Sequence, residues 1–101
     1  MHTFERWRYN LQLAPNVKTV TSMMNEYLDA VGPVLAVLPP ECQRALTPPI
    51  DVQAAAVTLL QAELRFKGSP ETAAVLHEVA HTFASAAVRI TSLHGKPPEA
   101  D

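Results

Sequence analysis

The hydrophobic positions of the chain fall into helical stripes that are separated by prolines. From residue 17 to residue 38, apolar side chains recur at alternating spacings of three and four, which is the period of one face of an amphipathic helix. The stripe consists of Val17, Val20, Met24, Tyr27, Val31, Val34 and Leu38. Asn16 stands where an N-cap is expected. Pro33 interrupts the stripe, and its missing amide predicts a kink or a split in the helix.

Two further segments have the same period. Asp51 is placed to cap a helix that Gly68 would end, and its stripe is Val52, Ala55, Leu59, Ala62 and Phe66. Ser69 followed by Pro70 predicts the start of a third long helix, running to about Leu93. Its stripe is Leu76, Val79, Phe83, Ala86, Ile90 and Leu93. A short helix is expected at PECQRAL, residues 40–46.

The first fifteen residues allow two interpretations. Trp7, Tyr9, Leu11 and Leu13 alternate with polar residues, which is the period of a half-buried strand. A helix with Phe4, Trp7 and Leu11 on one face fits almost as well. A strand here would need a partner from a second copy of the protein, because no other segment alternates convincingly.

These elements together predict a mainly α fold. We expect a small bundle of three principal helices plus a short helix, with an N-terminal extended arm, assembled as a homodimer. Residues 1–15 would form the arm as a strand or a short helix, residues 16–95 the helical domain, and residues 96–101 a flexible tail.

Composition narrows the class of protein. The chain has 101 residues, of which 48% are hydrophobic and 18% charged, with a net charge of -2; this describes one globular domain with a surface suited to self-association. With a net charge of -2, the chain has no overall basic field. Nucleic acid is therefore not expected to be its main partner. The lone Cys42 suits a reducing compartment, and the apolar runs are too short for a membrane span. We therefore expect a soluble, cytoplasmic protein.

The segment HEVAH, residues 77–81, matches the H-E-x-x-H pattern of zinc peptidases. On a helix, this spacing places His77 and His81 on one side, where they can share a zinc ion, while Glu78 acts as the general base on bound water. At about 100° per residue, the two histidines lie about 170° from the centre of the apolar stripe, so they are expected to face away from the main core.

A third zinc ligand is not evident from the sequence. Ala84 and Ala87 occupy the positions that carry glycine and histidine in the extended pattern of metzincins. The only acids downstream of the motif are Glu99 and Asp101, in the proline-bounded tail. His2 or a residue of a second chain would have to complete the site.

Residue types suggest two other candidate sites. Arg6 and Arg8, with Asn10 and Gln12, share one face of the possible strand, and such a ribbon can read bases in a major groove. Cys42 begins a short helix, whose dipole can lower the pKa of a thiol, but Glu41 opposes this effect. An ordinary buried cysteine is the simpler interpretation.

The sequence thus favours a non-enzymatic interaction or regulatory protein that works as a homodimer through a helical surface, without a cofactor. The first alternative is a small zinc-dependent hydrolase that uses His77, His81 and Glu78. The second is a DNA-binding dimer that uses Arg6 and Arg8 of the N-terminal arm.

Overall fold

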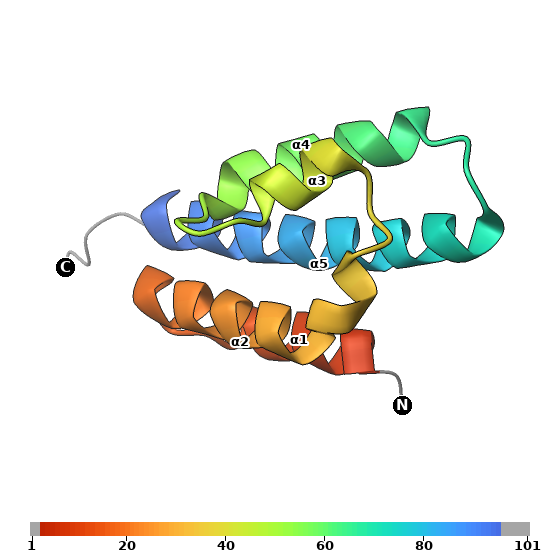
Figure 1. Ribbon diagram of the computed structural model, residues 1–101. Helices are drawn as coiled ribbons and strands as arrows, with labels where there is room; N and C mark the ends of the chain where they lie inside the picture. The colour runs from red at the N-terminus through yellow and green to blue at the C-terminus, as the bar shows by residue number, and fades with distance from the viewer. Residues whose placement is uncertain (1–2, 96–101) are drawn as a thin grey trace, which may run out of the picture.

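Five helices make up the described part of the chain, and the mainly α prediction is confirmed. A computed structural model describes residues 3–95 (Figure 1), and no strand occurs among them. The helices are α1 (Thr3–Gln12), α2 (Val17–Leu35), α3 (Pro40–Ala45), α4 (Val52–Arg65) and α5 (Pro70–Gly95). The expected tail at residues 96–101 lies outside the described residues.

The three side chains predicted to cap the N-termini of the long helices form the expected hydrogen bonds. Oδ1 of Asn16 accepts a hydrogen bond from the amide of Thr19 at 2.8 Å, and Oδ1 of Asp51 accepts one from the amide of Ala54 at 3.1 Å. Oγ of Ser69 accepts from the amide of Thr72 at 3.1 Å. Each cap satisfies one of the backbone donors that the first turn of a helix leaves without a partner.

Helix α5 is the centre of the molecule. Figure 1 shows α3 and α4 on one side of it and α1 and α2 on the other, and α5 packs against α1, α2 and α4. Four residues of its predicted stripe, Leu76, Val79, Phe83 and Ala86, are fully buried. The ring of Tyr27 makes edge-to-face contacts with Trp7 on one side and Phe83 on the other. These contacts join α1 and α2 to α5.

Residues 3–12 form a helix rather than the extended arm of the alternating pattern. The helical period decides which residues are covered: Leu11 is fully buried and Trp7 packs against the core, whereas Tyr9 and Leu13 are largely exposed. Burial of residues four apart is what a helix on a core produces. Whether this segment contacts a second copy stays a prediction.

Two helix ends differ from expectation. Helix α2 continues through Pro33 and ends at Leu35, before the predicted Leu38. Helix α4 ends at Arg65, and Gly68 has no positive φ, so it does not act as a left-handed terminator. A Cβ on Gly68 would lie only 2.3 Å from Cζ of Phe66. The glycine therefore makes room for the Phe66 ring where α4 ends.

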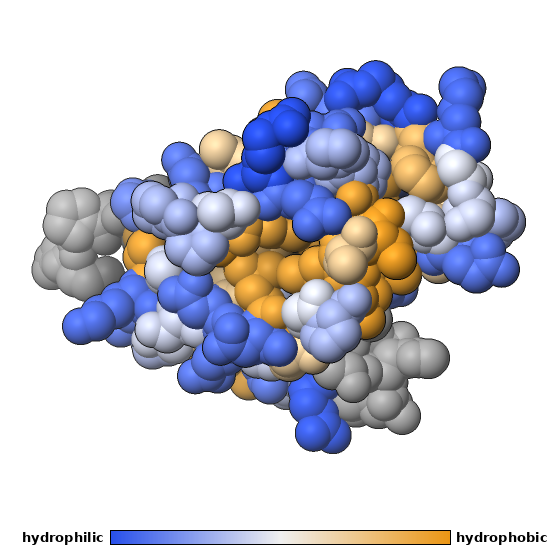
Figure 2. Space-filling view, in the orientation of Figure 1, coloured by the Kyte–Doolittle hydropathy of each residue, from blue (hydrophilic) through white to orange (hydrophobic). Residues whose placement is uncertain are grey.

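The remaining surface is partly apolar. Figure 2 shows apolar side chains in the hollow between α2 and the α3–α4 pair.

Cys42 of α3 is buried, and burial, with a smaller effect of Glu41, raises the pKa of its thiol to about 11. The ordinary buried cysteine is thus the correct interpretation. No described helix is long and apolar enough to cross a membrane.

Candidate metal centre

His77 and His81 lie one turn apart on the outer side of α5. Their side chains are 54% and 45% exposed, so the prediction that they face away from the core is confirmed. The imidazole rings stack with their centroids 4.1 Å apart and their planes tilted by 34°.

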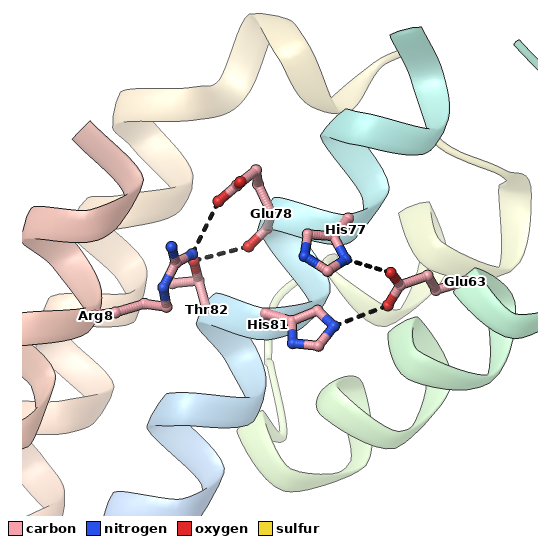
Figure 3. Close-up of polar contacts among 6 residues, drawn as sticks. All are labelled: Arg8, Glu63, His77, Glu78, His81 and Thr82. Atoms are coloured by element: carbon pink, nitrogen blue, oxygen red, sulfur yellow. Dashed lines mark hydrogen bonds and ion pairs between the residues drawn. The ribbon is translucent and has the colours of Figure 1, made fainter. Parts of the chain in front are cut away.

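The carboxylate of Glu63, from α4, lies between the two imidazoles (Figure 3). Oε2 of Glu63 is 2.5 Å from Nδ1 of His77, and Oε1 is 3.1 Å from Nε2 of His81. Because an ionised carboxylate can only accept hydrogen bonds, these two ring nitrogens carry the protons. One acid on α4 therefore orients both histidines of α5.

The environment of Glu63 favours its ionised form. Its partial burial acts to raise the pKa of the carboxyl, but the hydrogen bond from His77 and the nearby charges of His77 and His81 outweigh this effect and hold the pKa below its ordinary value. A carboxylate that stays ionised beside two imidazoles is also ready to bind a cation.

The arrangement suits a divalent transition metal. One ligand atom from each of Glu63, His77 and His81 can be chosen so that all lie within 4.8 Å of one another. Ligands about 2 Å from a tetrahedral zinc ion lie roughly 3.3 Å apart, so small side-chain rotations would close the set. Two histidines and one carboxylate leave a fourth position for water or another ligand.

Glu78, the acid within the motif, has a different partner. Its Oε1 accepts a charged hydrogen bond from Nη1 of Arg8 at 2.9 Å, and this pair joins α5 to α1 (Figure 3). Glu78 does not belong to the cluster of Glu63, His77 and His81. The general-base role expected of Glu78 would require it to leave Arg8.

The structure also separates Arg6 from Arg8. Residues two apart lie on different sides of a helix, so the arginine face of a DNA-reading ribbon is not formed in the described residues. Arg8 is half-buried against Glu78, and Arg6 is exposed.

A pocket of about 400 Å³ adjoins the histidines, between α1 and α5. We call it the polar pocket; it is lined by Arg8, Gln12, His77, His81, Ala84, Ser85 and Val88. A second, more apolar hollow of about 550 Å³ lies between α4 and α5 and shares Ala84 and Val88 with the first. We call it the apolar groove.

Glu63 is the residue that the sequence argument missed. The zinc-peptidase pattern directs attention to acids downstream of HEVAH, because the third ligand of a zinc peptidase follows its motif, whereas Glu63 precedes it. One signal was present: only residues 66–69 separate α4 from α5, and helices joined by a short connection pack as antiparallel neighbours. An acid near the end of α4 was therefore a candidate.

Comparison with known proteins gave no matching family, no similar curated sequence and no similar solved structure.

Proposed function

We propose that the protein is a small helical regulatory or interaction protein that binds a divalent transition metal, best matched by zinc, at Glu63, His77 and His81. The observation that supports this proposal is the convergence of the three side chains from two helices. Their chemistry is that of known zinc sites, in which histidine nitrogen and carboxylate oxygen are common ligands.

A structural or regulatory role fits the site better than hydrolysis. The bound metal would connect α4 to α5 near the short 66–69 connection, where it would restrain the separation of the two helices. The acid that a hydrolase would use, Glu78, is engaged with Arg8. Metal binding would thus stabilise the surface formed by α4 and α5 without requiring a reaction.

The alternative to a metal site is a purely structural contact. Two partly exposed histidines on one carboxylate contribute little to stability, about 0–1 kcal/mol for a surface pair. The two possibilities differ in metal binding, because a structural contact has no reason to bind zinc tightly.

The deciding experiment is the zinc content of untagged protein, loaded with zinc and then passed through a desalting column. We expect close to one zinc per chain, lost in the H77A/H81A double variant. His94→Ala is the matched control, because His94 is exposed in the last turn of the same helix, about 20 Å from His81 along the axis. Equal zinc in the double variant, or none in the wild type, would contradict the proposal.

Self-association through the apolar groove is a second proposal. Val57 of α4 and Val88 of α5 line this groove and are 54% and 63% exposed. No charged side chain is among the residues that line it, so two copies could meet there without repulsion between like charges. Sedimentation equilibrium should give a dimer for the wild type and a monomer for V57D/V88D; a wild-type monomer at all concentrations would contradict it.

A further inference from the structure

Two polar links between α4 and α5 lie at the two ends of the apolar groove. At one end, Nε2 of Gln53 donates a hydrogen bond to Oγ1 of Thr91 at 2.9 Å, and both residues line the groove. At the other end, the carboxylate of Glu63 contacts the imidazoles of His77 and His81 (Figure 3). The apolar side chains that line the groove between these links are Ala56, Val57, Leu60, Ala84, Ala87 and Val88. The polar links therefore help to set how α4 and α5 present this apolar surface.

The proposed metal centre lies one helical turn from the groove on both helices. Leu60, which lines the groove, precedes Glu63 by three residues on α4. Ala84 follows His81 by three residues on α5, a spacing at which side chains are neighbours on a helix surface. At about 100° per residue, Ala84 and Val88 also point within about 40° of the mean direction of the two histidines. The histidines and the groove thus occupy one continuous face of α5.

The distribution of polar and apolar side chains on this face suits a second copy of the chain. The centre of the face is apolar, at Ala84 and Val88, and its ends are polar, at the histidines and at Thr91. A twofold axis through the centre, perpendicular to α5, would place apolar surface against apolar surface and one polar end against the other. Among the described residues, those that line the groove carry no charge, so association there would leave no unpaired charge buried.

Metal binding and self-association would act on the same pair of helices. At the metal end of the groove, the link between α4 and α5 consists of contacts between partly exposed side chains. Zinc bound by Glu63, His77 and His81 would hold the two helices together at this end. Groups that are already ordered before association lose less conformational freedom in an interface. A groove fixed by the metal should therefore associate more tightly than the metal-free groove.

We propose that zinc binding strengthens self-association through the apolar groove, and that the dimer binds zinc more tightly than the monomer. This proposal rests on the metal site and the self-association proposed above. The second effect follows from the first, because the coupling between two binding equilibria is reciprocal. The fraction of dimer would then rise with the concentration of free zinc, which gives the metal a regulatory role.

Sedimentation equilibrium of untagged protein, with EDTA and with zinc, measures the coupling. We expect zinc to lower the dissociation constant of the dimer by about tenfold, within the range typical of coupled sites. Because the dimer would hold two zinc ions, this change corresponds to a rise of about threefold in zinc affinity at each site. Chelator competition at protein concentrations below and above the dissociation constant of the dimer measures that rise.

Three variants locate the effect. E63Q should give the same dissociation constant with zinc as with EDTA, because the proposed carboxylate ligand is lost. E78Q is the matched control, since Glu78 is not part of the cluster, and zinc should strengthen its self-association as in the wild type. V57N/V88N should stay monomeric and bind zinc with an affinity that does not depend on protein concentration.

The outcomes separate this proposal from the two on which it rests. Protein that binds zinc and dimerises with equal dissociation constants in zinc and in EDTA overturns the coupling alone. Protein that binds zinc but stays monomeric overturns the self-association together with the coupling, and protein that binds no zinc overturns the metal site together with the coupling. One zinc per dimer would show that the metal bridges two copies directly, which overturns the role assigned to the groove.

Discussion

Two carboxylates flank the histidines of α5, and they have opposite relationships to the motif. Glu78 lies within HEVAH, yet it binds Arg8 of α1. Glu63 lies outside the motif, on α4, yet it contacts both imidazoles. On the side of α5 that faces α1, Glu78 thus forms an ion pair between helices. On the side that faces α4 lie the three residues proposed to bind a metal. The local sequence pattern includes both histidines, but the acid that contacts both imidazoles lies outside it.

The largest expected effect is on zinc affinity, when each of the two acids is replaced separately. E63Q should weaken zinc binding by more than about 100-fold, because even an outer-sphere partner typically contributes about 10- to 100-fold. E78Q should leave the affinity within about threefold, since Glu78 is not part of the cluster. Competition with a chromophoric chelator measures both affinities. Equal losses in the two variants would place both acids at the metal.

Zinc should also stabilise the fold through the α4–α5 contact. At a free zinc concentration 100 times the dissociation constant, the free energy of unfolding should rise by about 2.7 kcal/mol. For a domain of this size, this corresponds to an increase in melting temperature of about 10 °C or more. Thermal unfolding followed by circular dichroism measures the shift. E63Q should abolish it and E78Q should retain it; the reverse pattern would refute the assignment.

The Arg8–Glu78 pair should have a smaller effect. Its side chains are 29% and 35% exposed, so solvent screens the pair and its coupling energy should be at most about 1 kcal/mol. A double-mutant cycle with R8M and E78Q, measured by urea unfolding of metal-free protein, gives this energy. A coupling of several kcal/mol would mean that the pair is a main attachment of α1.

The smallest effect concerns pH in the metal-free protein. The pKa of Glu63 is lowered in the folded state, since the interactions with His77 and His81 outweigh the opposing effect of burial. Its contribution to stability is therefore present above the ordinary pKa of 4.5 and is lost as the pH falls through the lowered folded value. The stability difference between wild type and E63Q should shrink below about pH 4.5. A difference that grows on acidification would contradict this prediction.

The helices were largely predictable because their signals are local. Asn16, Asp51 and Ser69 cap the helices expected of them, and the stripe of α5 is the core face. The segment around Trp7 and Leu11 was ambiguous, because its residues fit both a strand and a helix. Burial of Leu11 on the core, with Tyr9 left exposed, is a tertiary effect that the alternation could not show.

The candidate site was only half predictable for a related reason. His77 and His81 share a face through helical spacing alone, whereas Glu63 reaches them through the packing of α4 on α5. In the same way, the partner of Glu78 comes from α1, 70 residues away along the chain. Contacts between helices depend on packing angle and register, which single-residue spacings do not encode.

X-ray absorption at the zinc edge of the loaded protein tests the central claim most directly, because it reports the atoms bound to the metal. We predict two imidazole nitrogens per zinc, with a carboxylate oxygen in the same shell at about 2.0–2.2 Å. In E63Q, the spectrum should change or the zinc should be lost. A zinc ion with one imidazole or none, or an identical spectrum in E63Q, would show that Glu63, His77 and His81 do not form a metal centre.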